Sequence, residues 1–175
     1  MADKFILNNV IGELSPGAHI AVKRQAPPSF PDEVTPDGDG YYTHHGIYVK
    51  NPEGRDTVIH FWGERKSSAK VCSWDLEQFR SYGVDNELYE AQYKVRPLAL
   101  QKTVEMAWKE LSSPTKEWKY NLRTENCETF ATYLKTGRGF SPQAQKSGWN
   151  ILTWVSIGFA VVAVVCFLLF KLFKR

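Results

Sequence analysis

The sequence predicts an α+β fold, in which an antiparallel sheet packs on helices, followed by a C-terminal transmembrane helix. Residues 41–50 and 57–62 alternate polar and apolar side chains on either side of a turn, which is typical of a β-hairpin. Residues 98–111 and 127–134 carry apolar side chains three and four residues apart, which is the spacing of a helix. Residues 151–170 contain no charged side chain, which is typical of a membrane span.

The first part of the chain is predicted to form strands separated by turns. Residues 14–24 (LSPGAHIAVKR) open with a Pro-Gly turn and then alternate, which predicts a strand. Residues 25–40 are rich in Pro, Asp and Gly, which predicts a loop. The hairpin follows, with its strands at residues 41–50 and 57–62 and its turn at residues 51–56.

The second part of the chain mixes further strands with helices. Residues 70–74 and 89–96 are predicted strands, and residues 75–80 are predicted to form a short helix between them. A longer helix is predicted over residues 98–111, and its apolar face is made of Val104, Ala107, Trp108 and Leu111. A polar connection follows over residues 112–121.

A further amphipathic helix begins near Cys127. Thr124 or Asn126 can cap its first turn with a side-chain oxygen, and Gly137 is placed to end it. Its apolar positions recur at helical spacing, at Cys127, Phe130, Ala131 and Leu134. We expect this helix to pack on the core of the domain.

The uncharged segment 151–170 is long enough to cross a membrane. At about 1.5 Å per residue, a helix of this length spans roughly 30 Å, the thickness of a bilayer's hydrocarbon core. Trp149 and Trp154 stand at one end, where amphipathic rings favour the interface. The other end is closed by three cations, Lys171, Lys174 and Arg175. A buried core helix is the alternative, and an uncharged stretch followed by a basic cluster argues against it.

These features divide the chain into five parts. They are an N-terminal extension (1–13), a globular domain (14–137), a linker (138–150), a transmembrane tail anchor (151–170) and a basic tail (171–175). The first residues have short, interrupted apolar runs that do not resemble a signal peptide. We therefore expect a single-pass C-terminal tail anchor, with the domain facing the cytosol.

Charge is balanced outside the tail. The chain has 22 Lys and Arg against 19 Asp and Glu, and without the three tail cations residues 1–150 carry 19 of each. A nucleic-acid partner normally requires a basic excess, so we expect none. The three cysteines form no CxxC pair, which gives a zinc site no support and favours reduced thiols. We expect neither a metal nor an organic cofactor.

Cys127 is a candidate nucleophile because of its place in the predicted helix. In a first turn, unsatisfied N–H groups and the helix dipole favour an anion, so a thiolate and a neighbouring oxyanion are both stabilised. A nucleophilic thiol also needs a base and a group that orients the base. The chain has four histidines, His19, His44, His45 and His60. On position alone, a cysteine at a helix start is more often structural than catalytic.

Strand alternation separates the two adjacent histidines of the hairpin. One face holds His44, Gly46, Tyr48, Val58, His60 and Trp62, and the other holds His45, Ile47 and Val49. His45 is expected to be packed among the aliphatic side chains. His44 shares its face with a glycine, which leaves room for a close approach. We therefore expect His44 and His60 side by side, with the helix that carries Cys127 packed against them.

Three blocks of the sequence together resemble the lecithin:retinol acyltransferase family, and within it the small phospholipase A/acyltransferases. Residues 44–48, HHGIY, match the family pattern H-x-[AG]-I-Y. His60 follows on the next predicted strand, and residues 126–130, NCETF, match N-C-E-x-F. Residues 14–17, LSPG, are similar to the start of that family's first strand, and the resemblance spans residues 14–137.

The resemblance implies a fold and a set of roles. The family fold is a circularly permuted relative of papain and of the NlpC-type peptidases, in which the histidines precede the cysteine in the chain, as they do here. By this likeness Cys127 is the nucleophile, His44 is its general base, and His60 is the third member, which orients His44.

The function implied by the resemblance is that of a membrane-anchored thiol phospholipase A1/A2 and acyltransferase, acting on the glycerophospholipids of a bilayer. We expect the protein to be a monomer. The Cys127 thiolate attacks an ester carbonyl, a lysophospholipid leaves, and an acyl-thioester remains. Water then completes hydrolysis, whereas an amine, lysophospholipid or alcohol acceptor completes acyl transfer.

Two other classes of function stay open on the sequence. Permuted papain-like folds also host cysteine peptidases and isopeptidases, although His60 stands where those enzymes commonly have a carboxylate or an amide. A non-enzymatic tail-anchored membrane adaptor would need only the domain and the tail. Thr129 replaces a histidine of many family members, but this position lies outside the implied triad.

Overall fold

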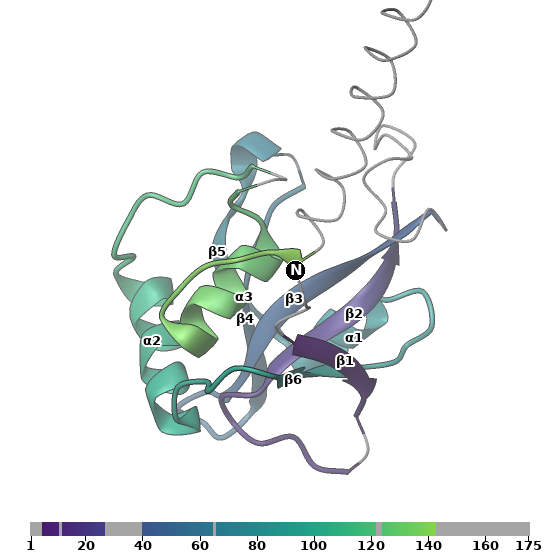
Figure 1. The fold of residues 1–175 in the computed structure, drawn as a ribbon, viewed down its shortest axis with the longest axis horizontal. Helices are drawn as coiled ribbons and strands as arrows, with labels where there is room; N and C mark the ends of the chain where they lie inside the picture. Colours follow the sequence, from purple (N-terminus) through teal and green to yellow (C-terminus); the bar gives the residue numbers. More distant parts are fainter. Residues whose placement is uncertain (1–4, 11, 27–39, 65, 122–123, 143–175) are drawn as a thin grey trace, which may run out of the picture.

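The computed structural model describes residues 5–10, 12–26, 40–64, 66–121 and 124–142. The elements of the described residues are β1 (Phe5–Asn9), β2 (His19–Gln25), β3 (Tyr41–Lys50), β4 (Asp56–Trp62), the 3-10 helix η2 (Lys66–Ser68), β5 (Lys70–Asp75), α1 (Leu76–Ser81), β6 (Tyr89–Tyr93), α2 (Leu100–Ser112) and α3 (Cys127–Thr136). The strands form one antiparallel sheet in the order β1-β6-β2-β3-β4-β5 (Figure 1). The predicted α+β architecture, an antiparallel sheet packed on helices, is confirmed.

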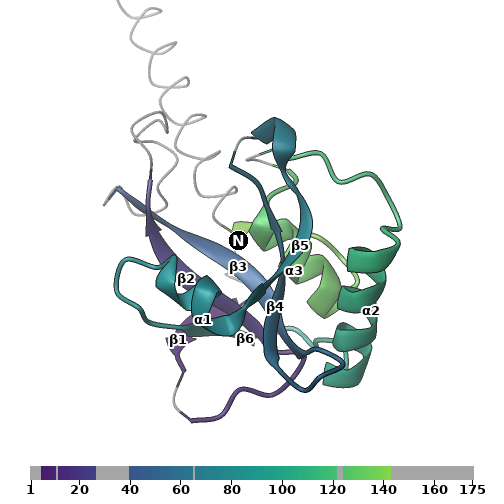
Figure 2. The ribbon, with the colours of Figure 1, turned by 180° about the vertical axis from the view of Figure 1, so that it is seen from behind.

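Helices cover both faces of this sheet. The helices α2 and α3 pack on one face, and α1 packs on the other, as the view from behind shows (Figure 2). The core under α2 and α3 contains Ile47, Val49, Ile59, Phe61, Ala107, Trp118, Phe130, Ala131 and Leu134. The core under α1 contains Ala18, Ile20, Val22, Tyr48, Val58, Phe79 and Leu88. The two faces of the β3–β4 hairpin therefore border two different layers.

The hairpin has the strands and the turn that the alternation predicts. Gly54 in its turn has a φ of 80°, in the left-handed region that favours glycine. Gly46 lies opposite His60, and a Cβ at this glycine would lie 2.5 Å from Cγ1 of Val58. This close approach requires a glycine, and it lets the side chains of the two strands meet on the α1 face.

The ends of α3 follow from two residues. Asn126 is its N-cap, because Oδ1 of this side chain accepts a hydrogen bond from the Thr129 N–H at 2.8 Å. Gly137 ends the helix with a φ of 74°. Asn126, and not Thr124, is therefore the cap among the two candidates that the sequence offers.

The largest difference from the sequence prediction lies in the N-terminal extension, residues 1–13, which contains a strand. β1 pairs with β6, from Phe5 opposite Tyr93 to Asn9 opposite Tyr89. The ring of Phe5 is buried, and its centroid lies 5.3 Å from that of Tyr93. The segment has no regular alternation. It forms a strand because it pairs with the free edge of β6 and buries one aromatic ring.

Several boundaries also differ from the prediction. The strand expected from residue 14 begins at His19, because a turn precedes it, in which the Ala18 N–H donates to the Ser15 carbonyl at 2.9 Å. Gly17 in this turn has a φ of 92°. The strand expected over residues 89–96 ends at Tyr93.

The predicted membrane span is not part of the described structure. Among the described residues, no helix is long and apolar enough to cross a membrane. The span at 151–170, the basic tail at 171–175 and the linker beyond residue 142 lie outside the described residues. So does the loop predicted over residues 25–40, apart from its two ends.

Candidate functional site

His44 of β3 and His60 of β4 meet on the face that α1 covers. Nε2 of His44 lies 2.8 Å from Nδ1 of His60, the distance of a hydrogen bond between two imidazoles. The Phe79 ring of α1 packs on both, with its centroid 5.5 Å from each imidazole. Both histidines are buried. The structure therefore brings these two candidate residues together, on the face that the alternation gives them.

Burial keeps both imidazoles neutral. Desolvation lowers the pKa of His44 well below its usual value, and the neighbouring His60 and the Arg24 charge lower this pKa further. Burial also lowers the pKa of His60, to about 3, with a smaller contribution from the Arg24 charge. A neutral imidazole can take up a proton, which is the state that a general base requires.

Cys72 of β5 extends the line of hydrogen bonds beyond His60. Cys72 lies opposite His60 in the sheet, and its Sγ is 3.5 Å from Nε2 of that histidine. If Nδ1 of His44 is to accept a proton, Nε2 of His44 must donate to Nδ1 of His60. His60 then carries its own hydrogen on Nε2, where the sulfur of Cys72 accepts it. Burial raises the pKa of the Cys72 thiol to about 11, so this partner stays neutral.

The helix that carries Cys127 does not pack on the face of His44. Cys127 begins α3, and α3 packs on the face of Ile47 and Val49, so the expected packing was wrong. On that face the hairpin presents Ile47, Val49, Ile59 and Phe61 to the apolar side of the helix, next to the buried His45. The other face carries Gly46 and the two histidines beside Tyr48 and Val58, and it packs against Phe79 of α1.

The sheet opens beside the start of α3. The pairing of β3 with β4 runs from Lys50 opposite Asp56 to Gly46 opposite His60 and goes no further. β3 nevertheless continues back to Tyr41, paired with β2, and β4 continues to Trp62, paired with β5. The two strands therefore diverge at Gly46.

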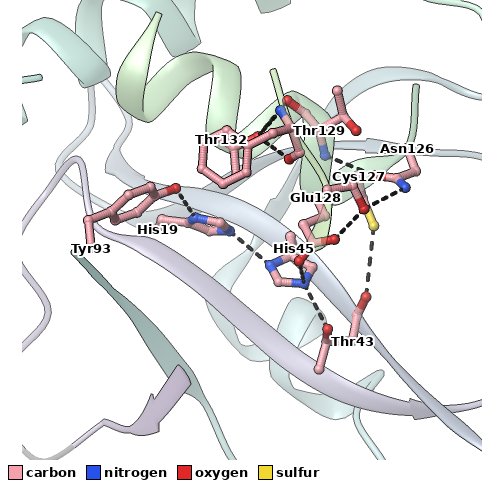
Figure 3. Close-up of polar contacts among 11 residues, drawn as sticks. His19, Thr43, His45, Tyr93, Asn126, Cys127, Glu128, Thr129 and Thr132 are labelled. Atoms are coloured by element: carbon pink, nitrogen blue, oxygen red, sulfur yellow. Dashed lines mark hydrogen bonds and ion pairs between the residues drawn. The ribbon is translucent and has the colours of Figure 1, made fainter. Parts of the chain in front are cut away.

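The thiol of Cys127 lies at this opening. Tyr48 directs its backbone N–H and C=O toward the β2 side, where they bond to Ala18 and Gly17. Successive residues of a strand point these groups to opposite sides, so Thr43 faces the β4 side. Sγ of Cys127 lies 4.0 Å from the Thr43 carbonyl oxygen (Figure 3). The sulfur thus reaches the edge of the strand that carries His44 on its next residue.

Cys127 is a buried thiol with a high pKa. Burial raises the pKa of this thiol to about 12 and outweighs the backbone N–H groups of His45 and Glu128, which lower it. The start of a helix therefore does not by itself produce a thiolate here. No hydrogen bond in the described part of the chain joins the sulfur to His44. A base must remove the proton when the thiol reacts.

A second pair of buried histidines lies on the α3 face. Nε2 of His19 is 2.8 Å from Nδ1 of His45, and the Tyr93 hydroxyl is 2.7 Å from Nδ1 of His19 (Figure 3). Oγ1 of Thr43 lies 2.8 Å from Nε2 of His45. His45 is packed, as predicted, but within a polar line that the sequence did not indicate. The contact with His19 depends on the register of β2 against β3.

This polar line continues to the first turn of α3. Oε1 of Glu128 lies 3.8 Å from Nε2 of His45. The Ser141 hydroxyl donates to the other carboxylate oxygen of Glu128 and accepts from Nδ2 of Asn126 at 3.1 Å. The turn that carries Cys127 is therefore fixed on both sides by buried polar contacts.

The four buried histidines predict a loss of stability on mild acidification. The pKa values of His45 and His60 are lowered from 6.5 to about 3, and those of His19 and His44 are also lowered well below 6.5. Below pH 6.5 the unfolded chain therefore binds more protons than the folded one. The free energy of unfolding should fall by about 1.4 kcal/mol per pH unit for each histidine that protonates on unfolding.

Urea unfolding at a series of pH values between about 7 and about 5 measures this slope, in a window above the titration of ordinary carboxylates. A free energy of unfolding that stays constant across the window would contradict neutral, buried imidazoles.

The candidate site gathers the thiols of Cys127 and Cys72 and the imidazoles of His44 and His60. Among the described residues, no group of three or more His, Cys, Asp and Glu side chains is placed to hold a metal ion. Both ring nitrogens of His19, His45 and His60 are engaged in hydrogen bonds, as is Nε2 of His44.

Comparison with known proteins identifies a family model that fits the chain. The model described as lecithin retinol acyltransferase matches residues 12–140, more than half of the chain. The matched region contains Cys127 and both histidine pairs. A search of the curated proteins gives no match.

Proposed function

This chain belongs to the lecithin retinol acyltransferase family, and we propose that it is a thiol phospholipase A1/A2 and acyltransferase of membrane glycerophospholipids. The family supports acyltransferase or phospholipase chemistry on lipids in general. One observation carries the specific function. The Cys127 thiol lies on the edge of β3, beside the residue before His44, and His44 is hydrogen-bonded to His60.

His44 is the general base in this proposal, and His60 is the residue that orients it. His60 holds Nε2 of His44, whereas Nδ1 of His44 has no hydrogen-bond partner among the described residues. Nδ1 is therefore the atom that accepts the proton of Cys127. The opening between β3 and β4 is the route by which the sulfur approaches this nitrogen, since the helix itself packs on the opposite face.

The first half-reaction forms an acyl-enzyme. The S–H proton of Cys127 moves to Nδ1 of His44 while the sulfur attacks an ester carbonyl carbon of the lipid. The backbone N–H groups of His45 and Glu128, which face the sulfur, stabilise the negative charge of the tetrahedral intermediate. The C–O bond then breaks, and the departing lysophospholipid oxygen takes the proton from His44. An acyl-thioester remains on Cys127.

The second half-reaction releases the acyl group. Water gives a proton to His44 and attacks the thioester carbonyl, which yields a fatty acid. An amine, lysophospholipid or alcohol attacks in the same way and yields an amide or an ester. In both cases the C–S bond breaks, and the sulfur regains its proton from His44.

The direct test of this mechanism is to trap the acyl-enzyme. The full-length protein is mixed with a phosphatidylcholine that carries labelled acyl chains, quenched in acid and digested. We expect mass spectrometry to find the label on the peptide that contains Cys127. Lipid hydrolysis with the label on another residue would contradict the assignment. Cleavage of peptides without cleavage of lipids would favour a cysteine peptidase.

We also infer that the domain is a circularly permuted papain-like fold. This inference is supported by the chain order, in which the strands that carry His44 and His60 precede the helix that starts at Cys127. Superposition of an experimental structure on papain, with the cysteine and one histidine matched, tests it. The inference fails if the strands and the helix around the matched pair do not coincide.

The apolar segment at 151–170 is the proposed membrane anchor, with the domain on the cytosolic side. A lipid substrate stays in the bilayer, so an anchor raises the effective concentration of the site at its substrate. A chain that ends at Ser147 should lose about tenfold or more of its activity on phosphatidylcholine vesicles.

The same truncated chain should keep its activity on a short-chain phosphatidylcholine dissolved as monomers, which is the control for an intact site. If the full-length and the truncated chain are equally active on vesicles, the tail serves only for targeting. The orientation is tested by adding a protease to intact organelles. Digestion of the domain together with a cytosol-facing control protein supports a domain on the cytosolic side. Protection of the domain in that assay contradicts it.

A further inference from the structure

Arg24 is a partly buried cation held by two aromatic rings. It lies on β2 opposite Tyr42 of β3. Its guanidinium carbon is 4.2 Å from the ring centroid of Tyr82 and 5.7 Å from that of Tyr42. Stacking on aromatic faces fixes the plane of a guanidinium and leaves its N–H groups pointing outward from the stack. Among the described residues, the contacts of this guanidinium are therefore with aromatic rings.

No carboxylate of the described residues pairs with this cation. In the part of the chain that the structure describes, the Arg24 guanidinium takes part in neither an ion pair nor a hydrogen bond. Arg55 and Arg80, in contrast, form ion pairs with Glu53 and Glu77. A planar group with five N–H donors and no acceptor among the described residues is suited to a ligand with paired anionic oxygens.

Arg24 lies beside the candidate site, on the same face of the sheet as His44 and His60. Strand alternation places it on the face of Ile20 and Val22, which border α1. Its charge lowers the pKa values of His44 and His60 and also acts on the Cys127 thiol. On β2, Arg24 is also two residues from Val22, which lies opposite His44, so the register places the cation near the His44–His60 pair.

The surface around Arg24 is aromatic. Tyr82 packs against Trp74, with centroids 4.8 Å apart, and Trp74 packs against Trp62, with centroids 4.9 Å apart, both at tilted angles. These three side chains are not fully buried, and Tyr82 is 38 % exposed. A cation set in an apolar, partly exposed surface suits a ligand that joins an anion to hydrocarbon.

We propose that Arg24 binds the phosphodiester of the glycerophospholipid acyl donor and so selects phospholipids over neutral glycerolipids, an assignment that rests on the function proposed above. The ester groups and the phosphodiester of such a lipid share one three-carbon glycerol unit. When an ester carbonyl is at Cys127, the phosphate therefore lies near the same site. The guanidinium fork pairs with two phosphate oxygens, and the Trp62–Trp74–Tyr82 surface contacts the glycerol and the first methylenes.

The test compares two acyl donors that differ in the phosphate group. Dihexanoylphosphatidylcholine carries it, and dihexanoylglycerol has the same acyl chains without it. For Arg24→Gln in the full-length protein, kcat/KM should fall roughly 10- to 100-fold on the phospholipid, the worth of a charge-assisted hydrogen bond. On the diglyceride it should change less than about twofold. Arg24→Lys keeps the charge but loses the paired N–H donors. Its kcat/KM on the phospholipid should lie between those of the wild type and of Arg24→Gln.

Lys23→Gln is the matched control. It removes the same charge from the adjacent residue of β2, whose side chain lies over the Tyr41 ring on the other face of the sheet. We expect it to leave both activities unchanged. An equal loss on both donors for Arg24→Gln, or no loss on either, overturns the role of Arg24. Activity that survives Cys127→Ala would instead overturn the proposed function, so the two failures are distinguishable.

Wild-type protein supplies a second measurement if Arg24→Gln does not fold. Dihexanoylphosphatidylcholine and dihexanoylglycerol are each tested for protection of Cys127 against iodoacetamide at equal concentration. The apparent dissociation constant obtained from protection should be at least about tenfold lower for the phospholipid than for the diglyceride. Equal protection by the two lipids overturns the assignment.

Discussion

Cys127→Ala should abolish both the release of fatty acid from phosphatidylcholine and the transfer of acyl groups to any acceptor. The substitution removes the only atom on which the proposed acyl-thioester can form. Loss of the nucleophile from a covalent mechanism costs about 10⁴-fold or more. The measurement is the initial rate of fatty-acid release by the full-length protein, together with labelling by an acyl-labelled phospholipid, and both should fall to background.

Two controls make this result specific. Cys127 is 5 % exposed and begins a helix, so alanine at this position leaves little space empty and keeps a good helix former. The free energy of unfolding of this variant should therefore lie within about 1.5 kcal/mol of the wild-type value, as is usual when a small buried side chain is shortened. Cys166→Ala removes another thiol of the chain and should retain activity and label. Unchanged lipid hydrolysis by folded Cys127→Ala would rule out the thiol mechanism.

His44→Gln should lower kcat by about 10²- to 10⁴-fold, the usual contribution of a general base. Glutamine keeps a polar group that can hydrogen-bond to His60, but it cannot take up a proton. Since burial raises the pKa of the Cys127 thiol to about 12, very little thiolate exists at neutral pH without a base. The rate of Cys127 alkylation by iodoacetamide at about pH 7 should therefore fall together with kcat.

His45→Gln is the matched control for this prediction. It changes the adjacent imidazole on the opposite face of the sheet, where His45 contacts His19 and Thr43. We expect this variant to lower stability, because it disturbs buried hydrogen bonds, and to keep kcat within about tenfold of the wild type. If His45→Gln abolishes activity while His44→Gln spares it, the base lies on the α3 face, and the assignment of His44 fails.

The hairpin and the two longer helices could be predicted from the sequence because their patterns are local. The alternation over β3 and β4 gives both the strands and the faces of their side chains, so the meeting of His44 with His60 follows from adjacent residues. Asn126 and Gly137 mark the ends of α3 for the same reason, since each acts within one turn of its own position.

Features that depend on distant segments could not be predicted. β1 forms a strand because β6, more than 80 residues later in the chain, offers an edge for pairing. The contact of Cys72 with His60 needs the register of β5 against β4, and the contact of His19 with His45 needs that of β2 against β3. Amphipathicity shows that α3 has an apolar face, but which side of the sheet this face covers depends on side chains of distant strands, such as Ile47 and Ile59.

The divergence of β3 from β4 at Gly46 sets stability against activity. Each further backbone hydrogen bond between these strands would contribute about 1 kcal/mol to the folded state. The same bonds would close the place where the sulfur of Cys127 lies. Directed evolution for heat resistance alone should therefore enrich variants in which β3 and β4 stay paired beyond Gly46 and lipid turnover is lost. A thermostable form must be selected on turnover as well.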